Sequence, residues 1–554
     1  MKGLLRWVPA AVIVASVVVG GCDERGDTPD SSDPQSVPSA GAAEAHDTFD
    51  PTEKARRNLG IVKNLEASVP PACYTKTGSA SNPCWVCHTV AVSPYGRDDR
   101  DLQSSYDFSP LSRTNRWNNL FEDRRAAAGA VSDEKVLRYV REDNYSTLRS
   151  SLESLSDYPG YTPDLDLAGG FDDAGFALDG SGWRAVRYLP FPGTFWPTNG
   201  SADDVFIRLP DAFRRNDAGE LDTAVYRLNL AILEAAIASR PSRDDGSLDR
   251  AVEPVDERLA GADLDADGRI DGTITTIRLL PRTFAGRARA VLVERYVFPE
   301  GTELLHSVRY LDPDAPTGAA RRMKELRYMR KVERLDRWAA LRAIEEEAEE
   351  KAEGRAPVYR GDARVGLRNA FGWQLQGFIE DERGRLRLQT DEEHRACMGC
   401  HGSLGVTIDS TFSFARKVPG KGGYRMQDLR GMPDVPEDGH EEGEVLTYLR
   451  RVGAADEMRH NDEMRARFFP DGVLAAREVA RAAPGGDRDL AALLVPTRGR
   501  ALALDKAYWA LVREQRFELG RDTVLAPPEN VHRIAPDEPA AESTYGDGRL
   551  TPAW

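Results

Sequence analysis

Two stretches, Cys397-Met398-Gly399-Cys400-His401 and Cys84-Trp85-Val86-Cys87-His88, decide how the rest of this chain is interpreted. Each has two cysteines separated by two residues and followed at once by histidine. Two such thiols add across the two vinyl groups of a haem, and the adjacent histidine reaches the iron. With six cysteines and eight histidines among 554 residues, one such motif is expected by chance about 0.001 times. The sequence therefore predicts two covalently bound haem c groups. The predicted attachment residues and iron ligands are Cys84, Cys87, His88, Cys397, Cys400 and His401.

Two other readings of the motifs are weaker. A structural zinc site needs two further ligands near each cysteine pair, and the chain has no matching second pair. A thioredoxin-like redox pair leaves both the histidine and the duplication unexplained.

The amino-terminal segment has the pattern of an export signal. Lys2 and Arg6 precede a short apolar run, which ends at Gly20-Gly21-Cys22. The run is shorter than the roughly 20 apolar residues that span a bilayer. A cysteine directly after small residues resembles a bacterial lipobox, and this resemblance implies that Cys22 is lipidated. In enteric lipoproteins an aspartate at the next position favours the inner membrane, so the resemblance implies that Asp23 places the protein on the periplasmic side of the inner membrane rather than in the outer membrane.

The overall composition excludes several classes of protein. Apolar residues make up 41% of the chain and charged residues 30%, a balance typical of soluble globular proteins. The net charge is −16, so a nucleic-acid partner is not expected. The expected partners are redox proteins of the cell envelope, together with the membrane itself through the lipid.

Helices are expected after both motifs. The pattern V-L-x-Y-[VL]-R occurs at residues 136–141 and again at 445–450, with Ser132 as an N-cap for the first copy. This diverged repeat resembles the c-type cytochromes, whose class I members close with such a helix. That resemblance implies a distal methionine before the helix, and Met432 has the matching position, with Met426 and His440 as rivals. The alternative is that Met432 is only a core residue.

The sixth ligand of the first haem is left open by the sequence, because residues 89–305 contain neither histidine nor methionine. An open iron, which would suit a catalyst, is one alternative. Cys73 is another, although a buried inert thiol is the simpler reading of this unpaired cysteine. The remaining candidates are His46, His394 and His306. His306 shares a strand face with Leu304, Val308 and Tyr310, where a core histidine is the better interpretation.

The region between the motifs contains strand and loop signals. Residues 273–280 have strand composition, and residues 289–310 suggest a hairpin around Pro299-Glu300-Gly301. Before them lies a D-x-D-x-D-G loop, which is typical of calcium sites, although an acidic solvated turn is the alternative. The predicted ligands of one calcium ion are Asp263, Asp265, Asp267 and Asp271.

We therefore expect an α+β fold with mainly helical, cytochrome c-like haem segments and a β-containing middle domain. Residues 318–354 are expected to be helical, as are 475–483 and 501–517. The expected division is a signal peptide (1–21), a tether (22–50), a first haem domain (51–158), a β-containing domain (159–312), a helical connector (313–390), a second haem domain (391–455) and a helical region (456–554).

Electron transfer by a lipid-anchored dihaem protein is the function that these features favour. The alternative resembles the dihaem peroxidases and oxygenases, with an open catalytic first haem and a second haem as electron relay. The spacing of 313 residues between His88 and His401 differs from those enzymes. A Cys73 ligand would instead indicate sulfur-compound chemistry. A non-catalytic scaffold is the weakest hypothesis.

Overall fold

The computed structural model describes residues 49–67, 69–76, 108–193, 195–238, 247–402, 409, 411–436, 440–452 and 459–535. The chain divides into two units, Met1–Thr48 and Phe49–Trp554, and all described residues belong to the second.

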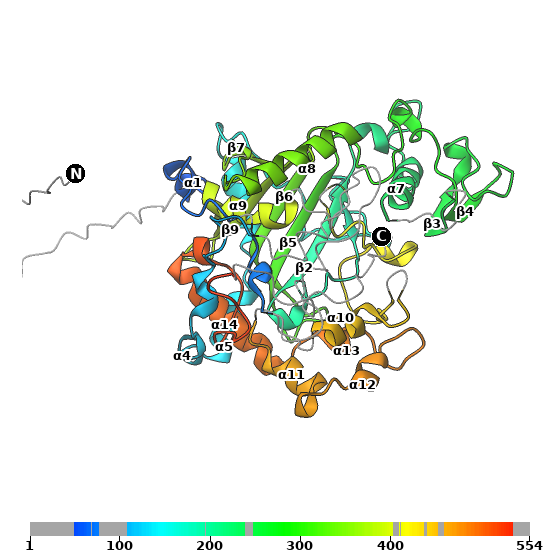
Figure 1. The fold of residues 1–554 in the computed structure, drawn as a ribbon. Coiled ribbons are helices and arrows are strands. Elements are labelled where there is room, and N and C mark those ends of the chain that lie inside the picture. The colour runs from blue at the N-terminus through cyan, green and yellow to red at the C-terminus, as the bar shows by residue number, and fades with distance from the viewer. Residues whose placement is uncertain are drawn as a thin grey trace, which may run out of the picture. The chain divides into compact units, whose positions relative to one another are not determined.

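A large antiparallel sheet forms the centre of this second unit (Figure 1). Its strand order is β1-β2-β5-β6-β9-β8-β7, and β10 pairs with β9. Two further strands, β3 and β4, form a separate antiparallel pair. The strands are β1 Arg184–Val186, β2 Ala202–Arg208, β3 Arg250–Asp256, β4 Thr273–Ile277, β5 Glu303–Leu311, β6 Ala319–Lys331, β7 Arg360–Asp362, β8 Gly366–Arg368, β9 Trp373–Glu380 and β10 Leu386–Leu388.

Helices surround the sheet. Among them, α9 packs against β8 and β9, α5 against β6 and α14, and α7 against β3. The helices are α1 Glu53–Arg57, α4 Arg125–Gly129, α5 Asp133–Arg141, α6 Tyr145–Glu153, α7 Thr223–Ala238, α8 Arg337–Ala352, α9 Asp391–His401, α10 Glu444–Val452, α11 Asp462–Phe468, α12 Ala476–Ala480, α13 Leu490–Leu494 and α14 Arg498–Glu514.

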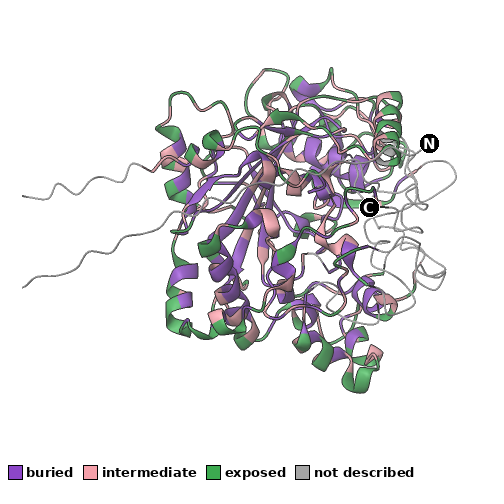
Figure 2. Ribbon diagram, turned by 60° about the vertical axis from the view of Figure 1, so that its left-hand side comes forward, coloured by how far each residue is buried: buried purple, intermediate pink, exposed green. Residues whose placement is uncertain are grey.

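The core lies on both faces of the sheet, whose long strands are largely buried (Figure 2). On one face, Val205 and Leu304 belong to a cluster that extends to Met398 of α9. On the other face, Phe206 and Leu305 belong to a second cluster. Neighbouring residues of one strand thus point to opposite faces, as the pleat requires.

The expected fold of mainly helical cytochrome-like segments with a β-containing middle domain is wrong. The eight-stranded sheet is the organising element, and it crosses the expected domain borders. Strands β5 and β6, for example, pair along their lengths although they lie on either side of residue 312. Both α9, which carries the second motif, and α5 rest on this sheet.

The expected helix over residues 318–354 is also wrong in its first half, where the chain forms β6. This strand lies between β5 and β9, with both edges paired. Its charged side chains Arg322, Lys324 and Glu325 are buried, so its sequence lacks the alternation of polar and apolar residues that marks a half-exposed strand. The apolar residues at intervals of three were therefore interpreted as one face of a helix. The second half of the segment does form a helix, α8.

Several local predictions are confirmed. The repeated V-L-x-Y pattern forms α5 and α10, and the Ser132 side chain caps α5 by accepting a hydrogen bond from the backbone N–H of Lys135. Helices α12 and α14 correspond to the two expected at 475–483 and 501–517. The strand expected at 273–280 forms β4. Only the second arm of the expected hairpin is a strand, β5, which pairs with β2 and β6.

Candidate functional site

Helix α9 holds the second motif at its carboxyl end. Its start is defined by a capping box, in which Thr390 Oγ1 accepts from the N–H of Glu393 (3.3 Å) and the Glu393 carboxylate accepts from the N–H of Thr390 (2.8 Å). Cys397 and Cys400 lie three residues apart and therefore share one side of the helix, and His401 is its last residue. All three side chains are half-buried and line a cavity.

This cavity, of about 260 Å³, lies between α9 and one face of the sheet. In the sheet, His306 pairs with Val205 on one side and Arg327 on the other. Arg327 in turn pairs with Gly377 of β9, on which α9 packs. The floor of the cavity consists of Asp203, Val205, Leu304, His306, Val308, Glu325, Arg327, Met329 and Leu375.

Aromatic rings line one side of the cavity. The His401 ring meets Phe412 edge-on, with 5.1 Å between ring centroids, and Phe412 meets Phe191 at 5.3 Å. On the floor, His306 meets Phe195 at 5.8 Å. Such apolar walls with a few polar groups are typical of sites for small molecules and cofactors.

The lining of the cavity is positively charged overall. Five cationic and three acidic side chains contribute to it, which gives a net charge of +2 with histidine neutral. The cations are Lys324, Arg327, Arg416, Arg459 and Arg521, and the acids are Asp203, Glu325 and Asp522. A ligand with anionic groups, such as the two propionates of haem, would balance this charge.

Two buried polar atoms in the lining have no hydrogen-bond partner among the described residues. They are the Tyr508 hydroxyl and Nε of Arg521. Buried polar atoms are rarely left unpaired in folded proteins. These two donors, the charge and the thiols of α9 together fit a haem held in this cavity.

Burial and charge determine the protonation of the groups around the thiols. Burial raises the pKa of Cys400 to about 11, and the nearby Arg327 guanidinium offsets this only in part. Burial alone would also raise the pKa of Glu325, but Arg327 and Arg521 outweigh it and lower that pKa to about 2. The acid is therefore an ionised anchor, bonded by Arg327 at 3.0 Å and Arg521 at 2.9 Å.

A hydrogen-bonded trio lies on the floor of the same cavity. Nε2 of His306 lies 3.0 Å from Oδ2 of Asp203, and the Tyr188 hydroxyl donates to the same oxygen. The sequence favoured a core role for His306. Its side chain is instead 19% exposed and faces the cavity, whereas Tyr310, which was expected on the same face, is buried in a different core cluster.

His394 and Met432, two of the predicted haem ligands, lie elsewhere. Both ring nitrogens of His394 are engaged: Nδ1 donates to the carbonyl of Thr390 at 3.0 Å, and Nε2 accepts from the N–H of Gly377 at 2.9 Å. Met432 is buried in the core beside Leu429 and is not part of the described cavity lining.

The remaining predicted haem ligands lie in different parts of the structure or outside the described residues. Cys73 is half-buried in a short 3-10 helix, Pro71–Tyr74, whose first residues line the cavity. Met426 packs at the edge of the second core cluster, and His440 is half-buried. The predicted residues Cys22, His46, Cys84, Cys87 and His88 lie outside the described residues.

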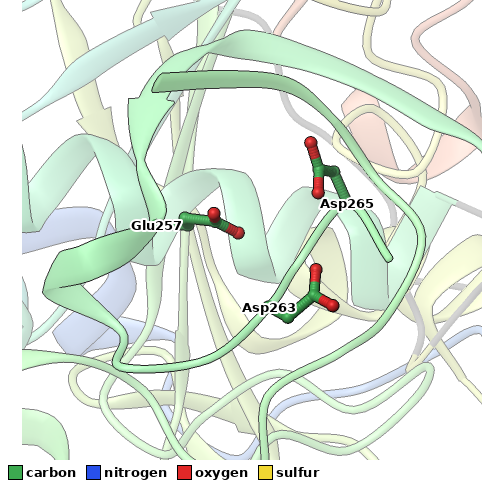
Figure 3. A group of neighbouring side chains, drawn as sticks. All are labelled: Glu257, Asp263 and Asp265. Atoms are coloured by element: carbon green, nitrogen blue, oxygen red, sulfur yellow. The ribbon is translucent and has the colours of Figure 1, made fainter. Parts of the chain in front are cut away.

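The acidic loop brings together a different set of carboxylates from the one predicted. Oxygens of Glu257, Asp263 and Asp265 lie within 4.8 Å of one another (Figure 3). Glu257 precedes the loop and was missed, because the motif spacing does not include it. Its carboxylate accepts from the N–H groups of Leu264 (2.9 Å) and Asp271 (3.1 Å).

Asp267 and Asp271 are not members of this carboxylate group. The Asp271 side chain is 62% exposed and lies 3.8 Å from Arg269. The prediction of a calcium ion therefore now concerns Glu257, Asp263 and Asp265.

Most residues of the cavity floor were not predicted from the sequence. Residues of β6, such as Arg327 and Met329, had been assigned to a helix. Arg416, Arg459 and Arg521 carry no local motif, because they reach the cavity from separate segments. The two thiols and the histidine on the α9 side of the cavity could therefore be predicted from a sequence motif. The groups that face them from the sheet could not.

Among the described residues, no helix has the length and apolar character needed to cross a membrane.

Comparison with known proteins gives the family. Residues 57–477 match the model of a lipoprotein family, whose description reads "-like lipoprotein". An "Uncharacterized lipoprotein" of Aquifex aeolicus (strain VF5) is 32% identical over 518 residues, covering 83% of this chain and 86% of the relative. No solved structure matches.

The chain therefore belongs to this lipoprotein family. This corrects the expected membership of the c-type cytochromes, which rested on short motifs rather than on the fold. Membership of the family makes the protein a lipid-anchored component of the cell envelope, which agrees with the lipidation expected at Cys22.

Proposed function

We propose that this lipoprotein binds haem covalently through Cys397 and Cys400, with His401 as iron ligand, and that it transfers electrons in the cell envelope. One observation carries the proposal. Helix α9 presents both thiols and the histidine to a cavity whose lining is apolar on one side and positively charged overall. A haem bound there would supply one-electron oxidation and reduction.

The described residues would have separate tasks in such a site. Cys397 and Cys400 would anchor the haem, and the capping box would fix the start of α9, the helix that carries both thiols. Phe191 and Phe412 would help to exclude water from the site. The buried donors of Tyr508 and Arg521 would pair with its carboxylates.

The second expected haem rests on the sequence alone. Its residues Cys84, Cys87 and His88 belong to the undescribed part of the chain, so the proposal of two haems is supported by the repeated motif. We also infer that the lipid is in the inner membrane and faces the periplasm, because Asp23 follows Cys22. Envelope redox proteins would then be its partners.

The proposal is tested by counting haems in the full chain. The protein is produced in a bacterium with a haem c attachment system and extracted from membranes with detergent. A pyridine haemochrome assay is expected to give two haems per chain. Mass spectrometry of peptides is expected to show haem bound to Cys397 and Cys400.

Paired variants identify the contribution of each motif. Changing Cys397 and Cys400 to alanine is expected to remove one haem and leave the other, as is changing Cys84 and Cys87. Cys73→Ala is the control, because Cys73 belongs to neither motif and is expected to leave the count unchanged. A wild-type count of zero would overturn the proposal.

A haem-dependent oxidoreductase is the second candidate, and one observation favours it. Met432, the expected sixth ligand of the second iron, packs in the core and not in the cavity lining. An iron without that ligand could accept substrate. Spectral shifts on adding cyanide or peroxide would favour the enzyme, whereas spectra indifferent to both would favour electron transfer.

A further inference from the structure

The hydrogen bond between His306 and Asp203 uses one ring nitrogen of the histidine and leaves the other, Nδ1, without a hydrogen bond within the described residues. Oδ2 of Asp203 accepts from the Tyr188 hydroxyl, so it is an acceptor toward His306 as well. The proton of the neutral imidazole is therefore on Nε2, which donates to Asp203 at 3.0 Å. Nδ1 keeps a lone pair, and it has no hydrogen-bond partner within the described residues.

Charged groups that favour and groups that oppose a positive imidazole both lie around His306. Asp203 on β2 favours it. Arg327, the cross-strand neighbour on β6, and Arg416 from the segment after α9 oppose it. Glu325 neutralises part of the charge of Arg327 through a 3.0 Å ion pair. A negative charge added in the cavity would favour the positive imidazole, because opposite charges attract more strongly where water is excluded.

We propose that His306 is the proton-exchanging group of this site: it takes up one proton at Nδ1 when a haem carried by α9 gains one electron, and releases it on oxidation. The proposal rests on the haem binding proposed above. The electron comes from a one-electron donor and the proton from water, so the charge of the cavity is unchanged. The 19% exposure of the side chain gives the proton access to solvent.

Asp203 and Tyr188 act as positioning residues in this scheme. Asp203 fixes the tautomer that leaves Nδ1 open, and it stabilises the imidazolium once formed. The hydrogen bond that the Tyr188 hydroxyl donates to the same carboxylate oxygen holds the Asp203 side chain in place. The cavity would thereby couple electron transfer to proton transfer, which a haem site without a titrating neighbour does not do.

The test is the pH dependence of the midpoint potential, measured by redox titration of the haem-loaded full chain. For a one-electron couple, a tenfold change in proton activity corresponds to about 59 mV when one proton accompanies the electron. The potential of the α9 haem is expected to fall with a slope approaching this value within about pH 5 to 8, where histidines titrate. The variant lacking Cys84 and Cys87 assigns the signal, because it holds only this haem.

His306→Gln is expected to abolish the slope while retaining an amide donor toward Asp203. His460→Gln is the matched control, since Nε2 of His460 also pairs with an aspartate, Asp462 at 2.9 Å, but outside the cavity lining. Asp203→Asn is expected to move the sloping region to lower pH, because the imidazolium loses its carboxylate.

A slope that persists in His306→Gln, or a flat wild-type profile, would overturn the inference while leaving haem binding intact. If His306→Gln does not load haem, Asp203→Asn and Tyr188→Phe are titrated instead, and profiles identical to wild type in both would overturn it. Failure of the proposed function is distinct, because it appears as the absence of haem in the pyridine haemochrome assay.

Discussion

The backbone N–H of Gly377 on β9 donates a 2.9 Å hydrogen bond to Nε2 of His394 on α9, one turn before the cysteine pair. The other ring nitrogen donates to the carbonyl of Thr390, at the start of the same helix. His394 therefore joins the sheet to the helix that carries the thiols, and burial lowers its pKa, which favours the neutral ring that these bonds require.

His394→Ala tests this structural role. The substitution leaves the N–H of Gly377 buried without a partner, so we expect a loss of about 1–3 kcal/mol in the free energy of unfolding. Urea denaturation followed by circular dichroism measures it. His460→Ala, at a half-exposed site, is the control and is expected to change stability little. A haem spectrum that changes spin state while stability stays constant would instead make His394 an iron ligand.

Met432→Leu separates a core residue from an iron ligand. Because Met432 is buried among apolar neighbours, this nearly volume-conserving change is expected to cost less than about 1.5 kcal/mol. In the variant with only the α9 haem, the absorption spectrum and midpoint potential are expected to stay the same. Loss of a methionine-to-iron charge-transfer band would show that Met432 reaches the iron and that the core packing rearranges on haem binding.

The sequence predicted those parts of the fold that local signals determine. Ser132 predicted the start of α5, and the spacing of apolar residues predicted α10 and α14. The central sheet was not predicted because β6, its middle strand, buries charged residues in ion pairs formed with distant segments. Glu325 with Arg521 at 2.9 Å is one such pair. No local pattern distinguishes a paired buried arginine from an exposed one.

The candidate site divides in the same way. Cys397, Cys400 and His401 are adjacent in sequence, and their chemistry has a fixed spacing. His306 and Asp203 are 103 residues apart and meet only because β2 pairs with β5. The spacing of the motif therefore predicts the α9 side of the cavity. The side formed by the sheet becomes visible only when the pairing of the strands is known.

Glu380 is expected to make stability fall as the pH rises. Burial raises its pKa from 4.5 to about 7, although Arg322 and hydrogen bonds from Tyr310 and Tyr139 oppose this. The folded state therefore holds the proton more tightly than the unfolded state, and this stabilisation, complete below pH 4.5, is lost as the pH rises through about 7. In urea denaturation between these limits, Glu380→Gln is expected to flatten the decline. An equally steep decline in the variant would assign it to other groups.

The acidic loop allows a direct test of calcium binding. Glu257, Asp263 and Asp265 present oxygens within 4.8 Å of one another, and hard oxygen ligands are those that calcium prefers. Calcium chloride is therefore expected to raise the melting temperature of the wild-type protein, since an ion that binds only the folded state stabilises it. Asp263→Asn is expected to abolish this shift, whereas Asp271→Asn is expected to keep it, because Asp271 points to solvent beside Arg269. Differential scanning calorimetry with calcium or with a chelator makes the comparison, and magnesium at equal concentration controls for ionic strength. Equal shifts in both variants would show that the loop is only an acidic turn.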